Sequence, residues 1–144
     1  MHRTPLIGAA LALALLMPGT PAARGHESNA DVVFEWNQIL QDTAPTPQNV
    51  LSPRFFSLMH IAMFDAINTL EREFDPYRVR LKQGSGGSPE AAAAQAAHDV
   101  LVVINPGSKP LYDALLATRI GTHPSGFVRR GAAVGAKVAS QILA

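Results

Sequence analysis

Three titratable side chains lie among apolar neighbours and are the first candidates for chemistry: His60, Asp65 and His98. His60 and Asp65 are five residues apart, about 140° around a helix, so they cannot bind one metal ion from the same turn. The metal-binding helix pattern HExxH is absent, and the neighbours His98 and Asp99 are expected to point to different sides. We therefore predict hydrogen-bonded polar groups of the core or an interface, and no metal site.

Asp65 and Asn68 stand one helical turn apart. Their side chains can both bond to backbone groups, so we expect hydrogen bonds to a neighbouring helix or loop end rather than acid–base chemistry. No GxSxG, GxGxxG or GxxxxGK[ST] pattern is present, which leaves no support for a hydrolase elbow or a phosphate loop. The glycines from Gly84 to Gly87 follow no predicted strand and are interpreted as part of a flexible linker, Lys82 to Ser88.

Composition excludes several other classes of protein. The 144 residues contain no cysteine, which excludes a disulfide scaffold, a zinc finger, an iron–sulfur site and a thiol enzyme. A formal charge of +1 and an aromatic content of 6% give no basis for nucleic-acid binding. An apolar fraction of 47% is typical of a folded chain, and the length fits one compact domain.

The first 23 residues have the order of a secretory signal peptide: a short basic start, an apolar run from Leu6 to Met17, a Pro-Gly break, then small residues. The apolar run is shorter than the roughly 20 residues that span a membrane. We therefore predict a secreted or periplasmic protein with no membrane span after signal removal. Cleavage is expected after Ala22, Ala23 or Gly25.

The remaining chain, residues 28–144, predicts an all-α domain of about five helices. Cap residues, helix-initiating prolines and terminating Pro or Gly residues mark the boundaries. The expected helices run from Ser28 or Asn29 to about Asp42, from Ser52 to about Phe74, from Pro89 to Ile104, from Lys109 to Ile120, and from a Ser125 cap to the end.

Two of these helices have patterns that predict how they pack. The helix from Ser52 carries a broad apolar arc and further apolar residues opposite, so we expect it near the centre of the bundle. The last helix has small residues at every fourth position, which favours tight helix packing within a soluble bundle. Its C-terminal turn carries no cap signal. We therefore expect the chain to be a truncated gene product or a sequence fragment.

The block from Arg54 to Tyr77 resembles the N-terminal helical region of the vanadium-dependent haloperoxidases, members of the type 2 phosphatidic acid phosphatase superfamily. The similarity lies in a Trp-Asn pair, Trp36-Asn37, and in the pattern Arg…His-x-Ala-Met-x-Asp-Ala-x-Asn, followed by an Asp-Pro-Tyr stop. The alanine run with His98 and the closing glycine–alanine helix are also similar, so the resemblance extends over residues 31–144.

The resemblance implies a pair of helical bundles whose chemistry lies in the C-terminal bundle. There, motifs of the form Lys-x6-Arg-Pro, Pro-Ser-Gly-His and Ser-Arg-x5-His-x3-Asp surround vanadate or phosphate. None is present here: Phe127 stands where the second motif has histidine. Arg54 and His60 match part of the third motif, but Pro53 replaces its serine and Asp65 comes one residue late. We therefore assign no catalytic, cofactor-binding or metal-binding residue.

Two hypotheses follow. The first is the accessory N-terminal helical half of an exported haloperoxidase-like or acid-phosphatase-like protein, inactive alone, whose partner is the missing C-terminal bundle or another helical surface. Vanadate is expected only where a C-terminal catalytic half exists. The alternative is a free-standing periplasmic helical module that binds a partner. An apolar face left exposed near the end of the last helix would favour the first hypothesis.

Overall fold

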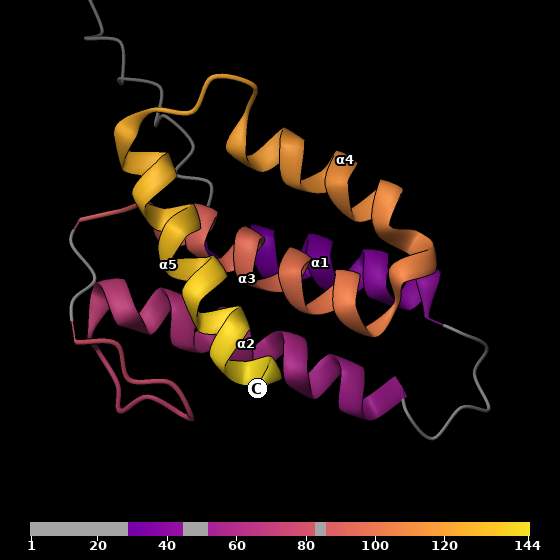
Figure 1. Cartoon of the computed structure of the whole chain (residues 1–144), viewed down its shortest axis with the longest axis horizontal. Helices are drawn as coiled ribbons and strands as arrows, with labels where there is room; N and C mark the ends of the chain where they lie inside the picture. Colours follow the sequence, from indigo (N-terminus) through magenta and orange to yellow (C-terminus); the bar gives the residue numbers. More distant parts are fainter. Residues whose placement is uncertain (1–28, 45–51, 83–85) are drawn as a thin grey trace, which may run out of the picture.

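Five α-helices and no β-strand form the described part of the chain, which in this computed structural model is residues 29–44, 52–82 and 86–144 (Figure 1). The elements are α1 (Asn29–Thr43), α2 (Ser52–Glu71), α3 (Pro89–Ile104), the short 3-10 turn η1 (Pro106–Ser108), α4 (Lys109–Ile120) and α5 (Gly126–Leu143). The all-α prediction is confirmed. The predicted signal peptide lies outside the described residues.

Helix starts follow the cap signals. The Ser88 hydroxyl oxygen accepts a hydrogen bond from the Ala91 amide (3.1 Å), and Pro89 takes the first helical position of α3. The Ser125 hydroxyl accepts from the Val128 amide at the start of α5 (3.3 Å). Gly121, with a φ of +79°, ends α4 as predicted.

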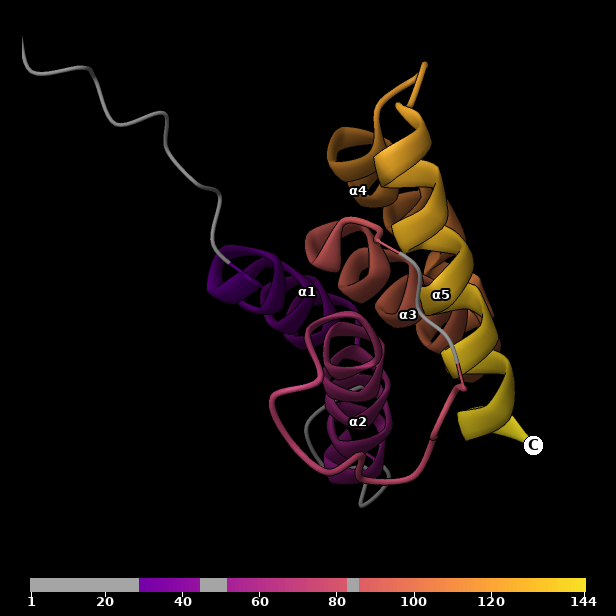
Figure 2. The ribbon, with the colours of Figure 1, turned by 90° about the vertical axis from the view of Figure 1, so that its left-hand side faces the viewer.

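The alanine-rich helix α3 occupies the centre of the bundle and contacts α1, α2, α4 and α5. Figure 2 shows α3 between the pair α1 and α2 on one side and the pair α4 and α5 on the other. The expectation that the helix from Ser52 lies at the centre is therefore wrong. Small alanine side chains allow four helices to approach one axis, whereas the larger side chains of α2 suit a helix packed from fewer directions.

Helices α3 and α5 pack so closely that two glycines of α5 are required. A Cβ atom added at Gly131 would stand 2.2 Å from the carbonyl oxygen of Ser88, and one added at Gly135 would stand 2.2 Å from that of Ala92. Real Cβ atoms do not approach backbone atoms so closely. The stripe of small residues on α5 thus brings two helices of the bundle together, as the sequence predicts.

Helix α2 ends at Glu71, three residues before the predicted end at Phe74. Arg72 adopts a left-handed conformation (φ +57°), and its amide donates to the carbonyl of Asn68 (2.8 Å), which is the αL cap of a helix C-terminus. The chain then folds back along the end of α2, because side chains of α2 bind its backbone.

The segment after this loop is partly fixed to α5. Gly87 and Ser88 are buried, and the Ser88 amide donates to the carbonyl of Phe127 (3.1 Å). The Arg130 guanidinium donates to the carbonyl of Gly86 (2.9 Å). The predicted flexible linker is therefore wrong for residues 86–88, because contacts with α5 hold them; residues 83–85 lie outside the described part.

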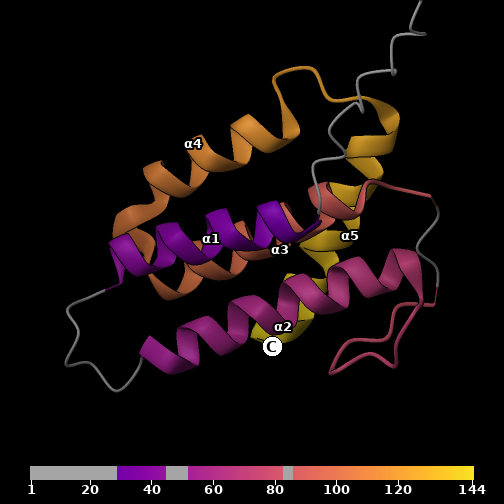
Figure 3. The ribbon, with the colours of Figure 1, turned by 180° about the vertical axis from the view of Figure 1, so that it is seen from behind.

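All five helices contribute side chains to the core, α5 through Val134, Val138, Ala139 and Ile142. Helix α1 runs antiparallel to α2 and lies beside α3, as Figure 3 shows from behind. The largest fully buried apolar and aromatic side chains come from α1, α2, α3 and α4: Trp36, Leu40, Met59, Met63, Leu101 and Tyr112.

Candidate functional site

Most of the titratable side chains singled out by sequence form two hydrogen-bonded clusters at different places in the fold. The first joins α3 to α4. His98 Nδ1 lies 2.8 Å from Asp99 Oδ1, and His98 Nε2 lies 2.8 Å from Asp113 Oδ1. Lys109 donates to the other oxygen of Asp113 (2.5 Å). The prediction that His98 and Asp99 point apart is wrong, because the Asp99 carboxylate reaches the neighbouring ring.

The two carboxylates favour the protonated imidazolium of His98, with one N–H donating to each. The hydrogen bond to Asp99 raises the pKa of His98 above its usual value; partial burial opposes this and Asp113 adds to it. Lys109 and His98 lower the pKa of Asp113 in turn. In this state neither nitrogen is free for proton transfer or a metal ion. No group of side chains in the described residues could hold a metal.

Aromatic rings and an amide network join this cluster to α1. The ring of Trp36 meets His98 edge-on, with centroids 6.4 Å apart, and also contacts Tyr112. Asn105 donates to the Tyr112 hydroxyl (2.9 Å) and to the carbonyl of Thr43 (3.0 Å). The Thr43 hydroxyl donates its single hydrogen to the Ile39 carbonyl. In its contact with Tyr112 it therefore accepts, and the Tyr112 hydroxyl donates. This hydrogen-bond network holds α1, α3 and α4 together, so we assign it a structural role.

The second cluster fixes the loop after α2. The carboxylate of Asp65, fully buried, accepts three backbone N–H bonds: from Tyr77 (2.7 Å), Arg78 (2.8 Å) and Val79 (2.7 Å). One turn further on, the Asn68 side chain donates to the Phe74 carbonyl (2.8 Å) and accepts from the Phe74 amide (2.9 Å). The expectation that Asp65 and Asn68 form hydrogen bonds to a neighbouring helix or loop end is confirmed, and the partner is the loop.

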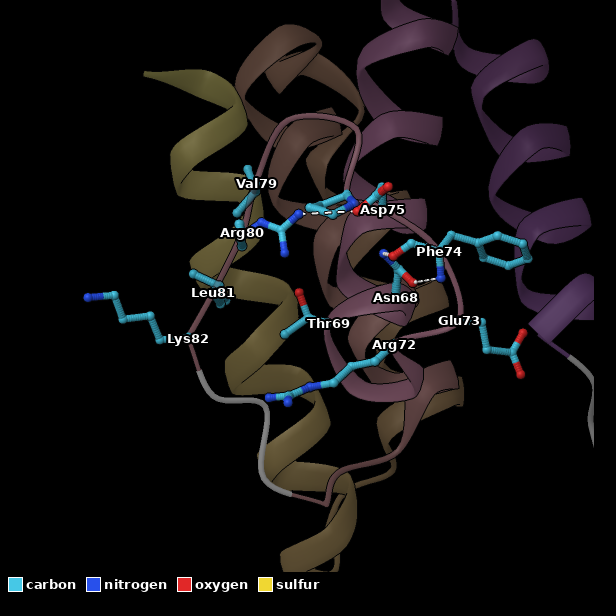
Figure 4. Close-up of a pocket in the computed structure, with 11 residues that line it drawn as sticks. Asn68, Thr69, Arg72, Glu73, Phe74, Asp75, Val79, Arg80, Leu81 and Lys82 are labelled. Atoms are coloured by element: carbon cyan, nitrogen blue, oxygen red, sulfur yellow. Dashed lines mark hydrogen bonds and ion pairs between the residues drawn. The ribbon is translucent and has the colours of Figure 1, made fainter.

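A polar cavity of about 560 Å³ lies between the end of α2 and this loop. Figure 4 shows Arg72 extending beneath Thr69 toward the segment that carries Leu81, and Glu73 pointing away. The guanidinium of Arg80 pairs with Asp75 at 3.3 Å, and both side chains are exposed. Pro76 and Leu81 add apolar surface to the lining, whereas the ring of Phe74 points away from the cavity (Figure 4).

A more apolar groove of about 350 Å³ lies at the other end of α2. It is formed where the start of α2 meets the ends of α3 and α5. One charged side chain, that of Arg54, joins five apolar ones in the lining: Phe55, Leu58, Ile104, Ile142 and Leu143. Val103, next to Ile104 on α3, is 60% exposed.

Arg54 and His60, the two residues that partly match a catalytic motif, have separate environments. Arg54 borders the groove, whereas His60 Nε2 lies 3.2 Å from Asn37 Oδ1 on α1. Partial burial lowers the pKa of His60, so the neutral ring donating to Asn37 is favoured. This bond joins the histidine of the α2 pattern to the Trp-Asn pair of α1.

Comparison of the chain with models of protein families, with curated proteins and with solved structures finds no match. Among the described helices, none is both long enough and apolar enough to cross a membrane.

Sequence reasoning identified Asp65, Asn68, His60 and His98 as polar groups with partners, but it missed both cavities. Each cavity is lined by residues far apart in sequence or by a loop whose path depends on hydrogen bonds. No local signal marked the polar cavity, because the predicted helix continued to about Phe74, past the left-handed residue Arg72 that ends it.

Proposed function

We propose that this chain is the accessory helical half of an exported protein of the haloperoxidase or acid-phosphatase type, and that it docks on a second helical bundle. The observation that supports the proposal is the apolar groove between α2, α3 and α5. Contiguous apolar surface of this kind commonly marks a protein interface.

The groove fits a helical partner. Its lining combines aromatic and aliphatic side chains, such as Phe55 and Leu58, with Arg54 as a polar group at the same site. Aromatic and arginine side chains are enriched at interfaces. A helix that inserts an apolar side chain into the groove and presents a carboxylate to Arg54 would satisfy both kinds of group.

In this proposal the chain contributes no ligand to an oxyanion. Vanadate or phosphate would be held by the second bundle, which carries the cationic motifs. Secretion or periplasmic export belongs to the same proposal and rests on the N-terminal sequence pattern.

The test is reconstitution with the second bundle. The coding DNA beyond codon 144 is read for a helical segment with the three family motifs, and that segment is produced separately. Binding is measured by calorimetry for the unchanged chain, for Leu58→Lys in the groove, and for Leu111→Lys as a matched control on the exposed surface of α4.

We expect Leu58→Lys to weaken binding by about thirtyfold or more, as for an interface hot spot, and Leu111→Lys to leave it within about twofold. Circular dichroism melts confirm that both variants are folded. Coding DNA without such a bundle, or equal binding by both variants, would contradict the proposal.

The alternative, a free-standing partner-binding module, is favoured by a different surface. Phe64, Phe74 and Tyr77 are exposed, and the rings of Phe64 and Phe74 lie 6.1 Å apart. Exposed aromatic side chains that gather together are typical of binding surfaces. Partner binding that survives Leu58→Lys and is lost in Phe74→Ser would favour this alternative.

A further inference from the structure

The polar cavity at the end of α2 has features of a ligand site that docking does not explain. Its volume of about 560 Å³ lies within the range of small-molecule sites, roughly 300–1,000 Å³. Its walls combine guanidinium groups, a threonine and apolar side chains. We propose that this cavity binds a small organic anion: a carboxylate or phosphate head held by Arg72, with Arg80 adding positive charge, on an apolar body.

The first support is the fixed shape of the loop. Asp65 and Asn68 together make five hydrogen bonds to the backbone between Phe74 and Val79. A fully buried carboxylate is costly unless such donors surround it. The loop therefore holds one path along α2, and the side chains that it carries have a defined position over the cavity.

The second support is Arg72 itself. Its φ of +57° belongs to the left-handed region, where a side chain costs about 1–2 kcal/mol relative to glycine. Its guanidinium has no hydrogen bond or ion pair to another described residue. Figure 4 shows this side chain lying along the cavity beneath Thr69. A strained backbone that positions a cation without a partner is typical of ligand-binding sites.

The third support is the state of the other lining charges. The Arg80–Asp75 pair is exposed on both sides, so it contributes little to stability and leaves guanidinium donors free. Glu73 points away from Arg72. Lys82 also lines the cavity and adds positive charge at its edge.

The position of the cavity at the carboxyl end of α2 restricts how an anion could be bound there. The carboxyl end of α2 carries partial negative charge, which opposes an anion. Binding must therefore come from direct, forked guanidinium contacts to the oxyanion rather than from a diffuse positive field. The partly exposed side chains of Pro76 and Leu81 supply surface for the apolar body, so a bare inorganic ion is expected to bind more weakly than an organic one.

The experiment measures binding of four probes to the purified chain by ligand-observed NMR and calorimetry. Phenyl phosphate and phenylacetate carry both head and body; inorganic phosphate carries the head alone; benzyl alcohol carries the body alone. We expect saturable binding of phenyl phosphate, phenylacetate or both, weaker binding of inorganic phosphate, and none of benzyl alcohol. Which organic probe binds more tightly distinguishes a phosphate ligand from a carboxylate one.

Three variants locate the site. Arg72→Gly removes the guanidinium and relaxes the backbone, so the chain stays folded and the affinity falls about tenfold or more. Arg72→Lys keeps the charge but loses the fork, and is expected to weaken binding severalfold. The control Arg78→Gln removes a positive charge from the same loop at a residue that does not line the cavity, and should change affinity by less than about twofold.

Absence of saturable binding by both organic probes up to about 10 mM would overturn the proposal, because that limit lies beyond even weak specific affinity. So would equal affinity of Arg72→Gly and the unchanged chain. Leu58 lines the groove near the other end of α2, 14 residues before Arg72 and so about 21 Å from it along the helix axis at 1.5 Å per residue. Leu58→Lys should therefore leave anion binding intact, which keeps a failure of docking distinct from a failure of this site.

Discussion

At the scale of single residues, Asp65 shows how one side chain determines the path of a loop. A buried carboxylate needs several donors, and three successive backbone amides supply them. These amides belong to a segment without helix or strand hydrogen bonds. The loop N–H groups and the Asp65 carboxylate therefore provide hydrogen-bond partners for each other. The polar cavity lies between this loop and the end of α2.

Replacement of Asp65 by asparagine should be strongly destabilising. An amide keeps one acceptor oxygen and brings two donors toward backbone N–H groups, so at least one buried N–H loses its partner, at a cost of about 2–4 kcal/mol. Urea unfolding at neutral pH measures the loss. The control is Asp75→Asn, whose side chain is 99% exposed, and which should change the free energy of unfolding by less than about 0.5 kcal/mol. Equal losses in the two variants would contradict this account.

The two half-buried histidines, His60 and His98, should make stability depend on pH in opposite directions. The raised pKa of His98 means that its contribution is complete below the ordinary value of 6.5 and is lost as pH rises through the raised value. The lowered pKa of His60 means that its contribution is present above 6.5 and is lost as pH falls through the lowered value.

Melting temperatures at closely spaced pH values test this for the unchanged chain and for His98→Gln and His60→Gln. In His98→Gln the decline of stability on the alkaline side of 6.5 should flatten. In His60→Gln the decline on the acid side should flatten instead. Identical profiles in all three proteins would show that neither ring changes its proton affinity on folding.

At the scale of elements, the contact between α3 and α5 is the closest in the fold. Backbone carbonyl groups of the start of α3 stand where side chains of α5 would be at Gly131 and Gly135. Alanines on α3 and glycines on α5 thus form one interface, in which the shortness of the side chains sets the distance between helices. The central position of α3 follows from the same property.

Gly135→Ala should therefore destabilise the bundle, although alanine is the better helix former. The new Cβ would meet the Ala92 carbonyl at 2.2 Å, and moving the helices apart is expected to cost about 1–3 kcal/mol. Gly107→Ala is the matched control, because nothing lies within 4 Å of a Cβ atom there. Chemical unfolding of both variants gives the comparison; a Gly135→Ala protein as stable as the control would mean that α5 packs differently.

At the scale of the whole molecule, the chemically active groups are dispersed. Arg54 borders a groove at one end of α2, Arg72 lines a cavity at the other, and His60 faces α1 between them. An enzyme that transfers or activates an oxyanion needs several cationic donors at one point. The lining of the cavity at Arg72 combines cations with the carboxylates of Glu73 and Asp75 and contains no histidine.

We therefore expect the isolated chain neither to oxidise halide nor to hydrolyse phosphate esters. The assay combines the purified chain with vanadate, peroxide and bromide, and separately with a chromogenic phosphate ester, each beside His60→Ala. Turnover that disappears in the variant would contradict the accessory role and make His60 a catalytic residue. Turnover equal in both proteins would point to a contaminating enzyme.

Most of the helix boundaries, and the need of some side chains for hydrogen-bond partners, could be predicted from the sequence alone. Hydroxyl caps, prolines and glycines act within a few residues of the chain, so the starts of α3 and α5 and the end of α4 could be predicted from their neighbours. Asp65 and Asn68 could be assigned hydrogen bonds to a neighbouring helix or loop end, because a carboxylate and an amide among apolar residues need polar partners. Their particular partners, residues 74 to 79, could not be predicted.

Three features depend on tertiary packing and could not be predicted: which helix lies at the centre, which residues surround His98, and where the groove and the cavity form. The faces of an alanine-rich helix differ little in hydrophobicity, so its sequence does not indicate how deeply the helix is buried in the bundle. The bond from His98 to Asp113 crosses from α3 to α4, and the groove needs the ends of three helices. Such features depend on how sequence-distant helices pack, because side-chain volumes at the contacts set the distances between their axes, and no local pattern records those distances.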